Sequence, residues 1–349
     1  MKLGKDYIGK NMQPPKLKDV NKELVFGKPK HFAIAFQTGK GHNDALLQRL
    51  ILGKQLRKDN ALYCEYDEHR STINFVKPEG WPPSRRIPTP RDANLYWPHL
   101  ESEEWGRSKV DSYWFWGFMR NTKRIVEVAE QKKIDWFFID HAYLYHQRHS
   151  MFEKYGDMNN CLFRVCKNNY VIDKITDTDD NRLLHLKARF AKDDELEIKP
   201  WNKNGKHIIV IPPSYWLCKN LGWNAKKVLQ DTIDELKKHT DREIRVRVKK
   251  VNGNYNTVPL HEDLKDAHAV VSFQSSAAAK AIIKGTPSFT ITDKYSASIP
   301  MSQTDLSKIE TPIYPDNRHE WLCNLANHQF YADEIQSGYA ERYLNEQHA

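Results

Sequence analysis

A pair of hydroxyl side chains, Ser275 and Ser276, stands where an apolar run gives way to a run of small residues. Residues 269–272 predict a buried strand, and residues 277–284 predict a helix that begins at the serines. Hydroxyls and unpaired backbone N–H groups at the N-terminus of a helix bind phosphate well. The same serines would also serve simply as the N-cap of that helix, so phosphate binding and capping both remain open.

The segment after this helix predicts that the two serines belong to a unit of parallel sheet. Gly285 suits the left-handed residue that ends a helix, and Pro287 prevents the helix from continuing. Residues 288–291 then predict a second strand. A strand, loop, helix and strand in this order form the repeating unit of parallel sheets in α/β proteins.

An acid and an imidazole, Asp140 and His141, follow the apolar run 134–139, which predicts another buried strand. Ligands of open α/β sheets bind at the carboxyl ends of strands. A carboxylate or an imidazole at such an end can take the proton of a hydroxyl group that attacks a substrate. The alternative is structural, with Asp140 capping a turn and His141 buried in the core.

Two more predicted strands end in residues that could contact a phosphorylated ligand. The apolar run 206–211 is followed closely by Ser214, and residues 244–249 alternate with a period of two, with Arg247 and Lys249 on the basic face. Those two charges would neutralise a diphosphate leaving group. The alternative is an edge strand whose basic face is solvated. The apolar face of that strand would consist of Ile244, Val246 and Val248.

A loop with two glycines follows residues 31–36, which predict the first strand of the chain. Its spacing is neither that of a P-loop nor that of the dinucleotide-binding fingerprint. The glycines permit the backbone to approach a ligand closely, although a tight strand-to-helix turn explains them equally well. The loop consists of Gly39, Lys40, Gly41 and His42.

Three other stretches carry expectations. The aromatic run 113–118 predicts the start of a helix that continues to residue 131, with its rings in the core. Residues 77–105, rich in proline, tryptophan and arginine, predict an irregular surface segment that contacts phosphates and stacks bases, or a structural insertion. Residues 177–180 contain an Asp-x-Asp pattern in a polar stretch, which we interpret as a solvated loop and not as a metal site.

Across residues 270–289 the order of apolar strand, two serines, alanine-rich helix, Gly-x-Pro and second strand resembles the nucleotide-sugar half of GT-B glycosyltransferases. The likeness is greatest to capsule-polysaccharide transferases and to phage enzymes that glycosylate modified DNA bases. Residues 305–312, 315–318, 321–322 and 327–330 resemble the phage members in particular. The resemblance covers the C-terminal part of the chain well and the first half more loosely.

This resemblance implies an α/β fold of two Rossmann-like domains that face each other across a cleft. Residues 1–30 would form a basic arm, residues 31–203 the acceptor domain, and residues 204–330 the domain that binds the nucleotide sugar. Residues 331–349 would form a C-terminal helix that crosses back to the N-terminal domain. The donor would be a nucleotide sugar, a UDP-sugar in the first place, with no tightly bound cofactor and no metal.

The resemblance also distributes the candidate residues between the two domains. In the N-terminal domain Asp140 would be the catalytic base, with His141 as the alternative. The cleft would be lined there by Gly39, Lys40, Gly41 and His42. The donor would be held in the C-terminal domain by Ser214, Arg247, Lys249, Gln274, Ser275 and Ser276.

Composition adds an expectation about partners. The 349-residue chain carries a net charge of +9, and its first 30 residues contain eight lysines and three acids. Such a basic balance suits a polyanion, nucleic acid above all, but also an anionic membrane surface or an acidic glycan. No apolar run approaches the ~18 residues that span a membrane. The lysine-rich start lacks the apolar core of a signal peptide, and five scattered cysteines suit the reducing cytoplasm.

The resemblance implies a glycosyltransferase that moves a sugar to a hydroxyl acceptor. The expected acceptor is the hydroxymethyl group of a modified pyrimidine in double-stranded phage DNA, brought to the cleft by base flipping. A surface or capsular polysaccharide is the alternative acceptor. A non-catalytic nucleic-acid-binding protein on an α/β scaffold is the second alternative.

Overall fold

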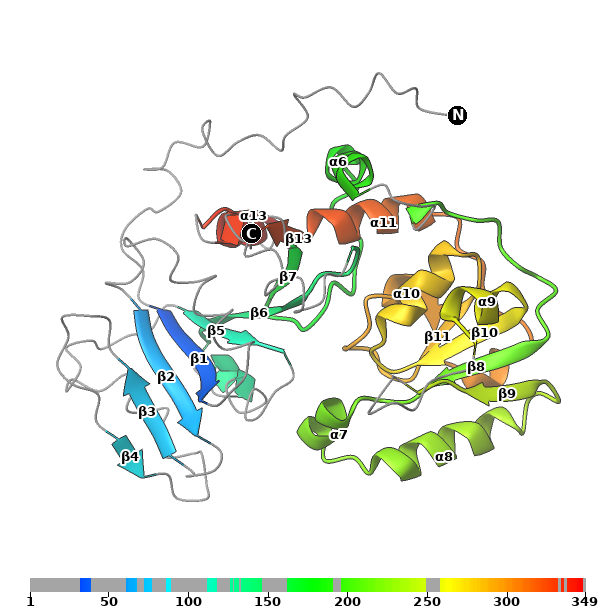
Figure 1. Ribbon diagram of the computed structural model, residues 1–349, viewed down its shortest axis with the longest axis horizontal. Coiled ribbons are helices and arrows are strands. Elements are labelled where there is room, and N and C mark those ends of the chain that lie inside the picture. The colour runs from blue at the N-terminus through cyan, green and yellow to red at the C-terminus, as the bar shows by residue number, and fades with distance from the viewer. Residues whose placement is uncertain are drawn as a thin grey trace. The chain divides into compact units, whose positions relative to one another are not determined.

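The computed structural model describes the backbone of residues 32–38, 61–67, 72–76 and 86–88. It describes the chain further at residues 112–117, 126–127, 129–131, 133–145, 162–190, 196–248, 258–331, 334–335 and 338–347. The described chain divides into two compact units, both drawn in Figure 1. The five-stranded unit contains Tyr170–His328, and the eight-stranded unit combines the described residues from 32 to Asn169 with those from Gln329 onward.

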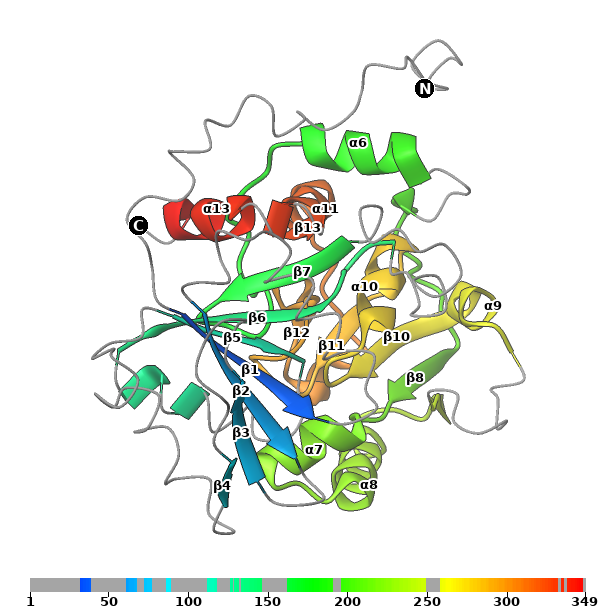
Figure 2. The same cartoon turned by 60° about the vertical axis from the view of Figure 1, so that its left-hand side comes forward.

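The eight-stranded sheet has a parallel centre and antiparallel margins. Its strand order is β13-β7-β6-β5-β1-β2-β3-β4. Strands β2, β1, β5 and β6 run parallel, whereas β3, β4, β7 and β13 join their neighbours antiparallel. Figure 2 shows how successive strands of this sheet rotate, as the twist of β-strands requires. The strands are β1 Phe32–Thr38, β2 Ala61–Asp67, β3 Thr72–Val76, β4 Arg86–Pro88, β5 Ser112–Trp116, β6 Asp135–His141, β7 Leu162–Lys167 and β13 Gln329–Tyr331.

Two expectations for this unit were wrong in part. Residues 126–127 and 129–131 are helical, as expected up to residue 131, but the helix does not begin at the aromatic run. The aromatic run that predicted a helix forms strand β5, where Trp114 and Phe115 are buried and Trp114 stacks on Phe137 of β6 at 4.2 Å. A run of aromatic residues buried on both sides suits a central strand at least as well as a helix. In the stretch predicted to be irregular, Arg86–Pro88 pairs with β3 as a short strand.

The five-stranded sheet is entirely parallel, in the order β12-β11-β10-β8-β9. Its central strands β8 and β10 are buried at every position, as their continuous apolar sequences predicted. The expected strand after Pro287 is confirmed as β11. The strands are β8 His207–Ile211, β9 Glu243–Val246, β10 Ala267–Ser272, β11 Ser288–Thr290 and β12 Ser302–Gln303.

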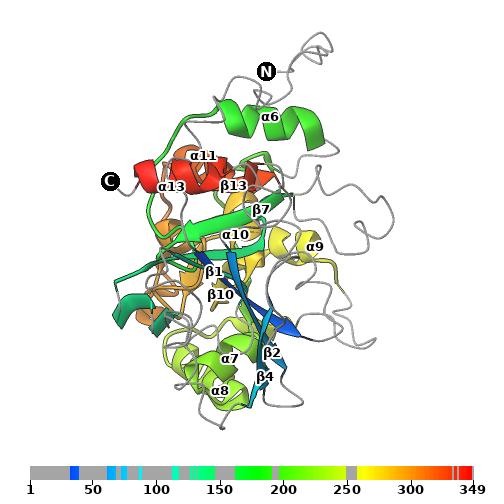
Figure 3. The same cartoon turned by 90° about the vertical axis from the view of Figure 1, so that its left-hand side faces the viewer.

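Helices cover both faces of the five-stranded sheet, as expected of a Rossmann-like unit. On one face Ile208, Val210 and Val271 pack with Leu236, and on the other Ile209 and Val270 pack with Ala278, Ala281 and Leu264. Figure 3 shows α7 and α8 together, and α9 and α10 on the other side of the strands. The helices are α6 Asn181–Phe190, α7 Tyr215–Leu221, α8 Ala225–Leu236, α9 Leu260–Lys265, α10 Ser276–Ile283 and α11 Arg318–Asn327.

The C-terminus of α10 has the predicted left-handed cap. Gly285 has φ +85°, its N–H donates to the Ile282 carbonyl at 3.2 Å, and the Thr286 N–H donates to the Ala281 carbonyl at 2.8 Å. These two bonds form a Schellman motif. A Cβ atom at Gly285 would lie 2.0 Å from the Pro200 carbonyl oxygen, so glycine is required here by space as well as by conformation.

The chain passes between the units at residues other than the expected boundary. Residues 170–203, which we expected to belong to the N-terminal domain, lie in the five-stranded unit because α6 and its preceding segment pack on α11. Asn324 Oδ1 accepts the N–H groups of Thr176 and Asp177, each at 3.0 Å. The C-terminal helix α13, Tyr339–Gln347, returns to the eight-stranded unit as expected and packs on β7 and β13. Among the residues that the structure describes, no helix has the length and apolar character of a membrane span.

Candidate functional site

The carboxyl edge of the five-stranded sheet gathers most of the residues predicted to bind a donor. All strands of this sheet run parallel, so the residues that follow β8, β9 and β10 lie along one edge. Ser214 follows β8, Arg247 follows β9, and Gln274 and Ser275 follow β10. Lys249 and the glycine loop at residues 39–42 lie outside the described residues.

Ser214 and Gln274 are joined directly across this edge. Ser214 Oγ accepts the Leu217 N–H at 3.2 Å, which caps α7, and it also accepts the Gln274 side-chain amide at 2.7 Å. Gln274 Oε1 is buried and has no hydrogen-bond partner among the described residues. Because Ser214 Oγ accepts both of these hydrogen bonds, its hydroxyl keeps its proton to donate, which suits a hydroxyl group of a sugar.

The two serines of the central sequence stretch have different positions at α10. Ser275 is the N-cap, and its Oγ accepts the Ala277 N–H at 3.2 Å, so the capping interpretation is confirmed for this residue. Ser276 is the first helical residue and is exposed. Phosphate binding at this helix start remains a prediction for both.

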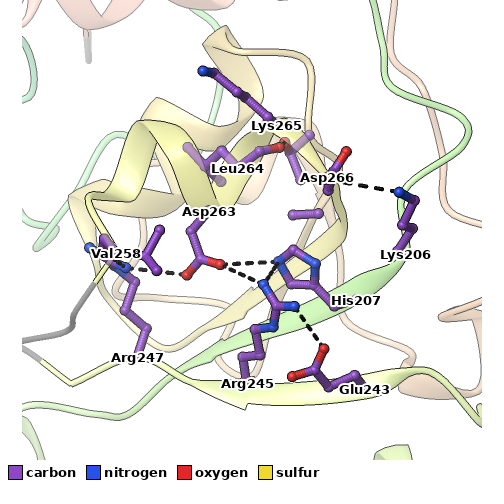
Figure 4. Close-up of polar contacts among 12 residues, drawn as sticks. Lys206, His207, Glu243, Arg245, Arg247, Val258, Asp263, Leu264, Lys265 and Asp266 are labelled. Atoms are coloured by element: carbon purple, nitrogen blue, oxygen red, sulfur yellow. Dashed lines mark hydrogen bonds and ion pairs between the residues drawn. The ribbon is translucent and has the colours of Figure 1, made fainter.

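Arg247 is held at the edge by the strand and by a neighbouring helix. Its backbone N–H donates to the Val210 carbonyl at 2.8 Å and so continues the pairing of β9 with β8. Its Nη1 donates to the Val258 carbonyl at 2.9 Å and to Asp263 Oδ2 at 3.2 Å (Figure 4). These two hydrogen bonds fix the position of the Arg247 guanidinium.

Asp263, on α9, is the centre of this charged network and was not singled out from the sequence. Its buried carboxylate also contacts Arg245 Nη1 and His207 Nε2, both at 3.2 Å. Arg245 in turn pairs with Glu243 at 2.7 Å, and this hydrogen bond raises the pKa of Arg245 and lowers that of Glu243. The signal for Asp263 was its helical spacing, because it shares the inward face of α9 with Leu260 and Leu264.

The predicted two-faced pattern of the β9 strand holds only in part. Ile244 packs on the core, but Val246 and Val248 are exposed because β9 is an edge strand and ends at Val246. The basic face is not simply solvated, since Arg245 and Arg247 both contact Asp263. Carboxylates that the sequence pattern does not reveal therefore compensate these charges.

Asp140 and His141 belong to the eight-stranded unit, at the end of β6. They lie within the strand, where Asp140 is opposite Arg164 of β7. Arg164 Nη2 contacts Asp140 Oδ2 at 2.7 Å, and Asp140 Oδ1 accepts the His141 backbone N–H at 2.8 Å. The guanidinium of Arg164 also lies 5.3 Å from the ring centres of Phe138 and Tyr143.

This environment fixes the charge of the arginine. Burial acts to lower the pKa of Arg164, but the nearby Asp140, Tyr143 and Cys166 together raise it above its ordinary value. Asp140 therefore faces a permanently charged partner. Its carboxylate could accept a proton from a hydroxyl group only while it is paired with Arg164.

The Asp-x-Asp segment is an exposed loop, as interpreted from the sequence. Asp177 Oδ1 accepts the Asp179 N–H, and Asp179 Oδ1 accepts the Asn181 N–H, both at 3.0 Å, where α6 begins. These carboxylates serve local turns of the backbone. Within the described ranges no three side chains of histidine, cysteine, aspartate or glutamate are grouped so as to hold a metal ion.

Neither a protein-family model nor a curated protein matches the chain. Among solved structures, the beta Kdo 2,7 transferase KpsC of Thermosulfurimonas dismutans aligns over 91% of this chain and 100% of its own, with 12% identity and a TM-score of 0.44. The beta Kdo 2,4 transferase KpsC of the same organism covers 72% and 96%, with 10% identity and a TM-score of 0.37. A glycotransferase of kitacinnamycin covers 91% and 99%, with 10% identity and a TM-score of 0.25.

Proposed function

We propose that this protein transfers a sugar from a nucleotide-sugar donor to a hydroxyl group of an acceptor. The observation that carries the proposal is the carboxyl edge of the five-stranded sheet, where Gln274 is bonded to Ser214 at 2.7 Å and Arg247 follows the adjacent strand β9. Neutral hydroxyl-binding groups next to an ordered cation suit a ligand that carries both a sugar and a diphosphate.

Each residue of the edge has a role in this proposal. The backbone N–H groups at the start of α10, with Ser275 and Ser276, would bind the diphosphate, and Arg247 and Lys249 would compensate its charge. Ser214 and Gln274 would orient hydroxyl groups of the donor. We propose a UDP-sugar as that donor, and transfer without a resident cofactor or metal ion.

We propose Asp140 as the catalytic base, with His141 as the alternative. The acceptor oxygen would form a bond to the anomeric carbon while its proton passes to the base. The bond from that carbon to the donor phosphate would break, and its electron pair would leave with the nucleoside diphosphate. The contact with Arg164 at 2.7 Å would fix the position of the Asp140 carboxylate at the end of β6.

For the acceptor we propose a hydroxymethylated pyrimidine in duplex DNA. The net charge of +9 and the eight lysines of the first 30 residues support a polyanionic partner, as does the resemblance to phage base-modifying enzymes. A polysaccharide acceptor is the alternative, and it would use the same donor edge. A non-catalytic nucleic-acid-binding role would use neither the edge nor Asp140.

The test is an incubation of the full chain with duplex DNA that contains hydroxymethylated pyrimidines and a panel of nucleotide sugars, followed by nucleoside mass spectrometry. We expect a hexose or pentose mass shift that is lost in Asp140→Asn and kept in Asp135→Asn, a control on the same strand. Donor hydrolysis without a shift in DNA would favour a glycan acceptor. DNA binding with neither hydrolysis nor transfer would contradict the proposed function.

A further inference from the structure

Asp263 divides its two carboxylate oxygens unequally among its neighbours. Oδ1 contacts Arg245 Nη1 and His207 Nε2, each at 3.2 Å, whereas Oδ2 contacts Arg247 Nη1 at 3.2 Å and no other described residue. The side chain of Asp263 is only 8% exposed, and in Figure 4 it points from α9 toward Arg245 and Arg247. One oxygen of a buried carboxylate is thus dedicated to Arg247.

Within the part of the chain that the structure describes, the Arg247 side chain forms hydrogen bonds through one nitrogen. Its Nη1 donates to both Asp263 and the Val258 carbonyl, while Nε and Nη2 have no hydrogen-bond partner among the described residues. Arg245 differs, because its Nη1 and Nη2 are both engaged, the latter with Glu243 at 2.7 Å. The free edge of Arg247, formed by Nε and Nη2, is a face with which guanidinium groups bind two oxygens of a phosphate.

We propose that Asp263 is a positioning residue that holds Arg247 with its Nε and Nη2 edge available to an oxyanion of the donor diphosphate. This inference rests on the proposed function. A side chain that is ordered before the ligand arrives loses less conformational freedom on binding. Asp263 would therefore act on donor affinity through Arg247 and would not touch the donor itself.

The test is a double-mutant cycle read by calorimetric titration of UDP into the full chain. We expect Arg247→Ala and Asp263→Asn each to weaken UDP binding by about tenfold or more, the effect of losing a charge-assisted hydrogen bond. In the Arg247→Ala background, Asp263→Asn should change the affinity no further. A side chain that only stabilised the fold would weaken binding equally in both backgrounds.

Two further variants keep the test decisive. Asp266→Asn is the matched control, because Asp266 is exposed at the end of α9 and lies 4.0 Å from Lys206; its UDP affinity should equal that of the unmodified chain. Arg247→Lys applies if thermal unfolding shows that Asp263→Asn does not fold. A lysine lacks the planar fork with which a guanidinium bonds Asp263 on one side and two phosphate oxygens on the other, so we expect a loss nearly as large as in Arg247→Ala.

The outcomes separate this inference from the function on which it rests. An unmodified chain that binds neither UDP nor another nucleoside diphosphate contradicts the proposed donor edge itself. Binding that Arg247→Ala weakens but Asp263→Asn and Arg247→Lys leave intact overturns the positioning role alone. Equal weakening by Asp263→Asn in both backgrounds also overturns that role.

Discussion

Two acid–arginine pairs, one in each unit, have the same components but opposite arrangements. In the eight-stranded unit the arginine is the more buried partner, since Arg164 is 14% exposed and Asp140 21%. In the five-stranded unit the acid is the more buried partner, since Asp263 is 8% exposed and Arg247 15%. The carboxylate is thus the more exposed member of the first pair and the guanidinium that of the second, although Arg164 and Arg247 themselves are exposed to nearly the same extent.

The difference follows from what surrounds each pair. Arg164 lies against the rings of Phe138 and Tyr143, which leave Asp140 as the accessible member at the end of β6. Asp263 lies between α9 and β9 and is bonded to three cationic or imidazole side chains, which leave Arg247 at the sheet edge. An accessible carboxylate suits proton transfer, and an accessible guanidinium suits an anionic ligand.

The largest effect is expected from a substitution that strains the backbone of the five-stranded unit. In Gly285→Ala the new Cβ would lie 2.0 Å from the Pro200 carbonyl oxygen at a φ of +85°, so we expect the free energy of unfolding to fall by about 3 kcal/mol or more and UDP binding to weaken with it. Gly222→Ala is the matched control. Its φ of +69° is also left-handed but nothing lies within 4 Å, so a loss of only about 1 kcal/mol is expected in denaturant unfolding. Equal losses in the two variants would contradict this account.

A smaller effect is expected from removing the buried Arg164, and a still smaller one from removing the more exposed Arg245. Arg164→Gln leaves Asp140 without its charged partner among buried rings, and we expect the free energy of unfolding to fall by about 2 kcal/mol. Arg245→Gln removes a guanidinium that is 43% exposed, and its cost should be at most about 1 kcal/mol. Urea denaturation measures both. If Arg245→Gln lowered the free energy of unfolding more than Arg164→Gln, this expectation would be wrong.

The smallest effect is a pH dependence that arises at His268 in the five-stranded unit. Burial lowers the pKa of His268, whose Nε2 lies 2.7 Å from the Ile309 carbonyl oxygen, so the folded chain favours the neutral ring. Its contribution to stability is present above the unfolded pKa of about 6.5 and is lost as pH falls below it, by an amount of order 1 kcal/mol. Arg164, whose pKa is raised, stays charged throughout. Thermal unfolding measured between pH 7.5 and pH 5.5 should show this loss of stability, and the loss should be smaller in His268→Gln. If stability changed with pH equally in that variant and in the unmodified chain, His268 would be excluded as the source.

The sequence predicted β8 and β10 because each is a continuous apolar run, and it predicted the end of α10 because Gly285 suits a left-handed cap. It predicted β9 from its alternation instead, and it did not predict β12. It failed at β5, where a short aromatic run fits a helix and a central strand equally well until the neighbouring strands are known. The contacts between charged side chains were harder to predict. Asp140 and Arg164 meet only through the register of β6 and β7, and Asp263 meets Arg247 only after α9 folds over β9.

The measurement that tests the comparison most directly is the initial rate of sugar transfer to hydroxymethylated DNA at varied UDP-sugar concentration, for the unmodified chain, Asp140→Asn and Asp263→Asn. The account predicts that Asp140→Asn lowers kcat by about a hundredfold or more with the donor KM nearly unchanged. Asp263→Asn should raise the donor KM about tenfold with kcat nearly unchanged. If both substitutions change the same parameter, the assignment of proton transfer to one pair and of anion binding to the other is wrong.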